Sequence, residues 1–253
     1  MELNFKTFGQ GDPIIILHGL FGTLDNWQTV GKQLAEHYMV YLVDQRNHGR
    51  SPHLDEISYP LMATDLQQFM ESQWIHRAHI LGHSMGGKTA MQFALTYPDM
   101  VDKLIVVDIA PKAYPGGHEL IFEALLGLDL ASIESRSDAA AYLENAGIAE
   151  AGIRQFLLKN MARSKAGGYE WKMNLPVIHQ HYQDILATVE STEAYDDPAL
   201  FIRGGKSRYI SDEDWPAVLR LFPQAKLETV AEAGHWVHAE APDALLQHLT
   251  QFL

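Results

Sequence analysis

Short apolar runs recur along the chain between longer stretches of helical periodicity, and this alternation most constrains the fold. The runs occupy residues 14–17, 39–43, 79–81, 104–108, 199–202 and 226–230. Strands buried on both faces read as short apolar runs, because neither side meets water. Apolar side chains also fall at helical spacing in residues 59–73, 86–97 and 242–253. The alternation predicts an α/β fold with a mostly parallel central sheet and helices on both faces.

The interval from residue 109 to residue 198 breaks this rhythm. It contains no run typical of a buried strand, but it has helical patterns at 119–128, 138–147, 153–162 and 180–189, and a stretch of extended character at 169–175. We expect a core of residues 1–108 and 199–253, with residues 109–198 inserted as a helical cap or lid. Insertions at the strand ends of an α/β sheet usually border the ligand crevice, which favours a lid over a purely structural subdomain.

The most informative stretch is Gly-His-Ser-Met-Gly-Gly at residues 82–87, a form of the G-x-S-x-G pattern. It lies between a predicted strand and a predicted helix. A serine in so sharp a turn needs small neighbours; Gly82 and Gly86 provide the space, and Gly87 lets the helix pack closely. The pattern also occurs in ordinary glycine-rich turns, but in this context it predicts Ser84 as a nucleophile.

A serine nucleophile needs a base, and His235 has the most suitable position among the 13 histidines. It follows Gly234 on the loop between the last predicted strand and the last predicted helix. His238 leads into that helix, so we expect it to pack or cap the loop. His83 precedes Ser84 on its strand and, by strand alternation, faces away from the base position.

A His-Gly turn at residues 18 and 19 follows the first strong predicted strand. Acyl transfer requires backbone N–H groups directed at the developing oxyanion. We expect Leu20, with Phe21 as the alternative, and Met85 to supply them. The loop DQRNHGRS at 44–51 also leaves a strand end, and we interpret its charged groups as structural.

Composition limits the partners. A net charge of −13 argues against nucleic-acid binding and disfavours attraction to anionic lipid. The chain has no cysteine, which excludes disulfides and thiolate chemistry. His179 and His181 lack an accompanying carboxylate cluster, so we expect neither a metal nor a cofactor. With no apolar run long enough to span a membrane and no signal-peptide pattern, a cytoplasmic location is expected; the sequence leaves the oligomeric state open.

Together these motifs resemble the α/β-hydrolase superfamily over essentially the whole chain. DQRNHGRS, GHSMGGKTAM and AGHWVHAE together resemble a subgroup of bacterial acyl esterases and their eukaryotic mitochondrial relatives. The resemblance implies hydrolysis of small acyl esters and, by proposal, acyl thioesters, with Ser84 as nucleophile, His235 as base, and Leu20 with Met85 as the oxyanion hole. Relatives that open epoxides or displace halide resemble the chain but carry aspartate at the elbow, whereas carbon–carbon hydrolases and acyltransferases keep the serine and stay open as alternatives.

The acid of the triad is where the chain departs from the superfamily pattern. The usual F-I-x-G-x-x-D reads FIRGGKS at residues 201–207, which puts Ser207 at the acid position. Asp212 and Asp214 lie beyond the turn and would reach the histidine only if the loop folded back. Asp108 ends a predicted strand beside the nucleophile strand, and the resemblance favours it as the acid. The alternative role for Asp108 is a helix or loop cap.

The sequence therefore predicts a serine hydrolase that cleaves carboxylic esters of short to medium acyl chains through an acyl-enzyme intermediate. Its partner is a small-molecule substrate. The alternatives are a hydrolase or lyase that acts on a small metabolite acid with the same triad, and a non-catalytic relative that binds a small ligand. Phe21, Trp27, Tyr114 and Trp171 are expected to line an apolar acyl pocket, with core packing as the alternative for each.

Overall fold

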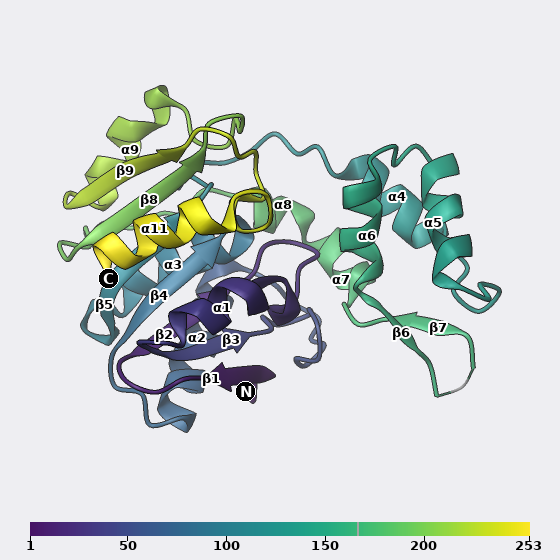
Figure 1. Ribbon diagram of the computed structural model, residues 1–253, viewed down its shortest axis with the longest axis horizontal. Helices are drawn as coiled ribbons and strands as arrows, with labels where there is room; N and C mark the ends of the chain where they lie inside the picture. Colours follow the sequence, from purple (N-terminus) through teal and green to yellow (C-terminus); the bar gives the residue numbers. More distant parts are fainter. Residues whose placement is uncertain (166) are drawn as a thin grey trace.

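A seven-stranded sheet forms the centre of the computed structural model, which describes residues 1–165 and 167–253 (Figure 1). Its strand order is β1-β3-β2-β4-β5-β8-β9. Only β1 runs antiparallel to its neighbour; every other pair in this sheet is parallel. The strands are β1 Phe5–Phe8, β2 Pro13–Leu17, β3 Met39–Val43, β4 Ala78–His83, β5 Val101–Val107, β8 Ala199–Gly204 and β9 Ala225–Val230.

Helices cover both faces of the sheet, as the alternating pattern predicts (Figure 1). Along β2, Ile14 and Ile16 belong to the hydrophobic cluster that includes residues of α1 and α11, whereas Ile15 and Leu17 belong to the cluster that includes residues of α2, α3 and α9. Successive side chains of a strand point to opposite faces, so one apolar run serves two layers. The helices are α1 Gln28–Leu34, α2 Tyr59–Ser72, α3 Met85–Thr96, α9 Trp215–Leu221 and α11 Pro242–Phe252. The predicted α/β fold class is confirmed.

The segment between β5 and β8 lies beside the sheet with a hydrophobic cluster largely its own (Figure 1). Core residues Phe21 and Met85 belong to this cluster, so it packs against the top of the sheet. Its elements are α4 Glu119–Gly127, α5 Arg136–Asn145, α6 Ala151–Leu158, β6 Met161–Arg163, β7 Tyr169–Trp171, α7 Leu175–Gln180 and α8 Tyr182–Leu186. Three expected helices occur at roughly the expected places.

Two details of this segment differ from the sequence prediction. The helix expected over 153–162 ends at Leu158, because residues 161–163 pair with β7 as a hairpin. A single helix over 180–189 is wrong. The chain turns at His181, whose ring bonds Asp184 and the Asp55 carbonyl, and it leaves helical geometry after Leu186.

The connectivity of the sheet determines where a site can form. From β2 the chain passes to β3 on one side of β2, and later to β4 on the other side. In open α/β sheets ligands bind outside the carboxyl ends of the strands, where the strand order reverses in this way. The turn after β2 and the turn after β4 meet there. No helix in the described part of the chain is long and apolar enough to cross a membrane.

Candidate active site

Ser84 lies at the tip of a sharp turn between β4 and α3. Its backbone has φ 54° and ψ −120°, a conformation that side chains rarely adopt. The strain fixes the hydroxyl above the sheet at the first turn of α3. The backbone amides at that helix end favour negative charge.

The glycines around Ser84 occupy positions where a side chain would clash with the neighbouring backbone or side chains. A Cβ on Gly82 would lie 2.1 Å from the Gly86 carbonyl oxygen, and one on Gly86 would lie 2.4 Å from the Leu17 carbonyl oxygen. A Cβ on Gly87 would lie 2.5 Å from Ile109 Cγ2. Strand β4, helix α3 and the end of β2 therefore pack backbone to backbone, as the G-x-S-x-G spacing predicts.

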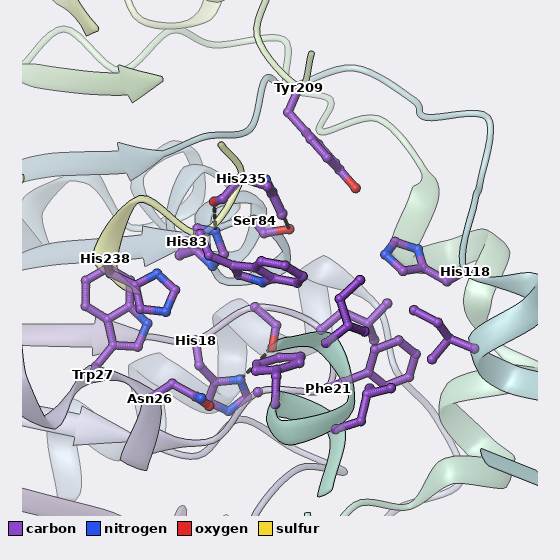
Figure 2. A pocket seen from close by; sticks show the side chains of 18 of the residues that line it. His18, Phe21, Asn26, Trp27, His83, Ser84, His118, Tyr209, His235 and His238 are labelled. Atoms are coloured by element: carbon purple, nitrogen blue, oxygen red, sulfur yellow. Dashed lines mark hydrogen bonds between the residues drawn. The ribbon is translucent and has the colours of Figure 1, made fainter. Parts of the chain in front are cut away.

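His235 stands over this serine on the loop after β9 (Figure 2). Its Nε2 lies 3.0 Å from Ser84 Oγ, and its Nδ1 lies 2.7 Å from Asp108 Oδ2. A carboxylate can only accept, so Nδ1 carries the proton and Nε2 accepts from the serine hydroxyl. The Tyr209 ring stacks on the imidazole at 3.9 Å between centroids, which holds its orientation.

Asp108 follows the last residue of β5 and is completely buried. Its backbone has φ 52°, which turns the carboxylate toward the histidine loop. Oδ1 accepts the Gly204 backbone N–H at 3.0 Å, and Oδ2 accepts from both Ser207 Oγ and His235. Three donors therefore hold this buried carboxylate in place.

The position on the β8 loop that usually carries the acid is thus occupied by Ser207, a hydrogen-bond donor. Ser207 donates to Asp108 and also accepts the Tyr209 backbone N–H at 3.2 Å. Asp212 lies away from the site: it pairs with Arg203 at 2.6 Å, and its side chain is 87% exposed. Asp214 pairs with Lys112 and Ser211. Among the described residues, Asp108 is the only candidate carboxylate that reaches His235.

The His-Gly turn after β2 is fixed by its own hydrogen bonds. His18 Nδ1 donates to the Gly19 carbonyl at 2.9 Å, and its Nε2 accepts the Gln45 N–H at 3.1 Å. This pattern needs a neutral ring, and burial lowers the pKa of His18 accordingly. The turn closes with the Gly22 N–H on the Gly19 carbonyl at 2.9 Å, which places Leu20 at the mouth of the site.

Two further histidines pack behind His235. His83 Nε2 donates to the backbone carbonyl of His235 at 2.8 Å, and burial keeps its pKa well below the usual range (Figure 2). His238 stacks on Trp27 with 4.4 Å between ring centroids, and burial lowers its pKa to about 3. Both are neutral rings that pack against the loop, in line with the roles expected of them.

Sequence reasoning missed the carboxylate of Glu240, which accepts the backbone N–H groups of Gly234 and Trp236, at 2.7 and 3.2 Å. These two residues flank His235, so Glu240 fastens the loop on both sides of the imidazole. Glu240 is an acidic residue in the first turn of the short helix α10 Val237–Glu240, where carboxylates are favoured, and this was the available signal.

Two cavities meet at Ser84, and both are lined by Leu20, Ser84, His118 and Tyr209. The first, here called the His235 cavity, has a volume of ≈ 260 Å³ and is shown in Figure 2. The second, the Lys88 cavity, has a volume of ≈ 250 Å³. Further lining of the His235 cavity comes from His83, Ile121, Ile153, Phe156, His235 and Trp236, and of the Lys88 cavity from Tyr59, Met85, Lys88, Tyr182, Ile185 and Arg208.

The four expected pocket residues separate into three places. Phe21 and Trp27 line the His235 cavity, and Tyr114 lines the Lys88 cavity. Trp171 lines neither. It sits in the β6–β7 hairpin, opposite Met161, beside a separate hollow that includes Arg50. Its expected place in the acyl pocket is therefore corrected, because the hairpin carries it away from the sheet end.

The loop at 44–51 is tied down by buried contacts. Arg46 makes a bidentate pair with Asp65 of α2, at 2.5 and 2.8 Å. Asp44 accepts backbone N–H groups of Leu24 and Arg50, at 2.7 and 2.9 Å. Neither charged side chain lines either cavity at Ser84. This geometry agrees with a supporting role beside the site.

The arrangement has the parts for activating a serine hydroxyl by proton transfer. Ser84 Oγ can pass its proton to His235 Nε2, and the buried Asp108 carboxylate is placed where it would stabilise the imidazolium that results. The described residues contain no cluster of side chains that could hold a metal ion.

Comparison with known proteins is consistent with this geometry. A family model described as alpha/beta hydrolase fold matches residues 12–242. Esterase YbfF of Escherichia coli K12 is 41% identical over 242 residues, covering 95% of this chain and 92% of that protein. The sn-1-specific diacylglycerol lipase ABHD11 of Xenopus tropicalis is 41% identical over 250 residues, covering 96% and 78%. A solved structure described as a marine microorganism esterase matches with a TM-score of 0.97 and 43% identity, covering 100% and 99%.

Proposed function

Because the chain belongs to the alpha/beta hydrolase fold family, we propose that it is a serine hydrolase that cleaves carboxylic esters through an acyl-enzyme intermediate. The observation that carries the proposal is the hydrogen-bonded series Ser84–His235–Asp108 at the meeting point of two cavities. Similarity to an esterase and to a diacylglycerol lipase over nearly the whole chain supports the reaction class.

In the proposed mechanism His235 Nε2 takes the proton of Ser84 as Oγ attacks the ester carbonyl carbon. The carbonyl π electrons move to oxygen, and the tetrahedral intermediate collapses when the bond from carbon to the leaving oxygen breaks. His235 gives its proton to that oxygen, and the alcohol departs. A water molecule then attacks the acyl-enzyme with the same base, which releases the acid and restores Ser84.

Asp108 serves this cycle without changing its own protonation state. It keeps Nδ1 of His235 protonated, so that Nε2 is free to accept, and it stabilises the imidazolium. The backbone N–H groups of Leu20 and Met85 form the proposed oxyanion hole. The hydrogen-bonded turn at Gly19 and the N-terminus of α3 support that assignment, because both hold these amides rigidly before reaction.

Residues 109–198 are the proposed cap over the core of residues 1–108 and 199–253. The segment contributes Ile121 and Phe156 to the His235 cavity, and Tyr182 and Leu186 to the Lys88 cavity. Asn160 Nδ2 also donates to the Phe21 carbonyl at 2.6 Å, which ties the segment to the oxyanion turn. We therefore expect the cap to set substrate size.

The proposed substrates are esters of short to medium acyl chains, together with acyl thioesters, which follow the same acyl-enzyme route. Cavities of ≈ 260 and ≈ 250 Å³ support small groups on both sides of the scissile bond. The motifs DQRNHGRS, GHSMGGK and AGHWVHAE support placement in the subgroup of bacterial acyl esterases and their mitochondrial relatives. We further propose a cytoplasmic location.

Activity-based labelling tests the proposal. The wild-type protein is incubated with a fluorophosphonate probe, the modified peptide is identified by mass spectrometry, and hydrolysis is measured with 4-nitrophenyl esters and acyl-CoAs of graded chain length. We expect labelling at Ser84, and we expect Ser84→Ala to abolish labelling and to lower ester turnover by about 10⁴-fold or more. A folded Ser84→Ala protein with a tenth of wild-type turnover would overturn the covalent-serine mechanism.

A further inference from the structure

The two cavities at Ser84 differ in which catalytic group they meet. His235 must protonate the leaving group, so the leaving group has to lie next to its imidazole. His235 lines the first cavity and not the second. Met85, whose amide faces the acyl oxygen in the proposed mechanism, lines the second and not the first. The leaving group therefore belongs in the His235 cavity, and the acyl chain in the Lys88 cavity.

The acyl side contains a buried lysine. Lys88 lies in the first turn of α3, where its backbone N–H donates to the Ser84 carbonyl at 3.1 Å, and both residues line the Lys88 cavity. Its side chain is almost completely buried, between the rings of Tyr59 and Tyr114, whose centroids are 5.5 and 4.8 Å from Nζ. The ammonium donates to the carbonyls of Leu186 and Ala187, at 3.1 and 2.5 Å.

Among the described residues, no carboxylate pairs with the charge of Lys88. Lys88 takes part in none of the ion pairs between described residues, and no carboxylate is among the described residues that line its cavity. Arg208, a second cation on the cavity wall, is also without such a pair. Two unpaired cations in one cavity contrast with the net charge of −13 of the whole chain.

Burial without a counter-ion destabilises the charged form of a lysine and therefore lowers its pKa. Burial lowers the pKa of Lys88 to about 7. An ammonium has three N–H donors, and two of them are used by the carbonyls. A carboxylate that entered the cavity would accept the third donor, stabilise the charged form, and remove part of the desolvation cost.

We propose that the Lys88 cavity is the acyl subsite and that Lys88, aided by Arg208, makes it selective for acyl groups whose far end carries a carboxylate. This inference rests on the proposed ester hydrolase function and narrows its substrate class to half-esters of dicarboxylic acids. Plain alkyl acyl chains of equal length leave the ammonium without a counter-ion and bind less well.

Matched esters test the inference directly. The rate constant kcat/KM is measured for 4-nitrophenyl hexanoate and for the mono-4-nitrophenyl ester of adipic acid, which has the same chain length and leaving group. Wild-type protein is expected to favour the adipate ester. Lys88→Met keeps the length and apolar stem of the side chain, and it is expected to lower the adipate-to-hexanoate ratio by about ten- to a hundredfold, the value of a hydrogen bond to a charged group. Arg208→Gln, at an exposed position, is expected to lower it by a smaller factor.

Lys103→Met is the matched control. Lys103 also donates to two backbone oxygens, of Phe252 and of the last residue Leu253, both at 2.8 Å, beside an aromatic ring, but it lines neither cavity. Its ratio should equal that of the wild type. A wild-type preference for hexanoate overturns the inference even if Lys88→Met does not fold, and so does a ratio unchanged in both Lys88→Met and Arg208→Gln. Failure of the wild type to cleave either ester, with no labelling of Ser84, would instead overturn the proposed function and this inference with it.

Discussion

The replacement of Asp108 by asparagine should inactivate the protein while leaving it folded. The carboxylate accepts three hydrogen bonds: the Gly204 N–H on Oδ1, and Ser207 with His235 on Oδ2. An asparagine offers one oxygen. If that oxygen keeps the Gly204 amide, the NH₂ group faces the other two partners. Ser207 can rotate to accept, and His235 can accept once its proton moves to Nε2. Gly204, Ser207 and His235 then each keep a hydrogen bond to the side chain, but His235 is in the wrong tautomer.

The wrong tautomer has a calculable cost to the reaction. With a proton on Nε2, His235 cannot take the proton of Ser84, and no carboxylate stabilises the imidazolium. We expect turnover to fall by about 10⁴-fold, which corresponds to about 5.5 kcal/mol of transition-state stabilisation. The free energy of unfolding should change by less than about 1 kcal/mol, because no buried polar group is left unpaired and a buried charge is removed.

Three measurements check this reasoning. Ester hydrolysis gives the loss of rate, thermal unfolding reports the stability, and nitrogen NMR of the histidine rings reports which nitrogen of His235 carries the proton. Asp212→Asn is the control, since its side chain is 87% exposed and pairs with Arg203. An Asp108→Asn protein that keeps more than a tenth of wild-type turnover, or a collapse of activity in Asp212→Asn, would return the acid to the β8 loop.

Three further predictions concern neighbouring side chains. His235→Ala should lower turnover by about 10⁴-fold. His238→Ala should act mainly on the free energy of unfolding, by roughly 1–3 kcal/mol, because it removes a ring stacked on Trp27. The reverse order in rate and unfolding assays would show that the wrong histidine has been assigned. Ser207→Ala should keep turnover within about tenfold of wild type, because Asp108 retains Gly204 and His235 as donors; a loss comparable to that of Asp108→Asn would give Ser207 an essential role. Burial lowers the pKa of Lys88 to about 7 in the folded state, so between about pH 7 and pH 10 the unfolded chain binds one more proton than the folded chain. The free energy of unfolding of the wild type should therefore rise with pH in this window relative to that of Lys88→Met. A difference between the two proteins that is the same at pH 7 and pH 9 in urea unfolding would contradict this prediction.

Much of the fold could be predicted because buried parallel strands have a strong local signal. Strand β1 was missed for the opposite reason. Phe5–Phe8 lies at the edge of the sheet with a partner on one side only, and its two central residues are exposed. No apolar run distinguishes such a strand. Of the β6–β7 hairpin, the extended stretch expected at 169–175 covers β7, whereas β6 was missed. With only three residues in each strand, no periodicity distinguishes β6 from the end of the helix before it.

The site shows where sequence reasoning is strong and where it ends. The turn at Ser84 requires glycine at positions 82 and 86 for steric reasons, so this part of the site could be predicted from a few neighbouring residues. The structure also brings Ser84, His235 and Asp108 together, while their catalytic roles stay predictions. Contacts such as Ser207 with Asp108, or His83 with the His235 carbonyl, join residues 99 and 152 positions apart. Such pairs depend on how the loops close over the sheet, which no local pattern encodes.

The backbone of Ser84 has a consequence for the evolution of this protein. A φ of 54° with a ψ of −120° is a conformation that glycine tolerates and serine resists, at a cost on the order of 1–3 kcal/mol. Ser84→Gly should therefore unfold at a higher temperature than the wild type while losing the proposed nucleophile. Under the proposed mechanism, selection for heat resistance alone would favour glycine at this position, and selection for turnover would retain the hydroxyl.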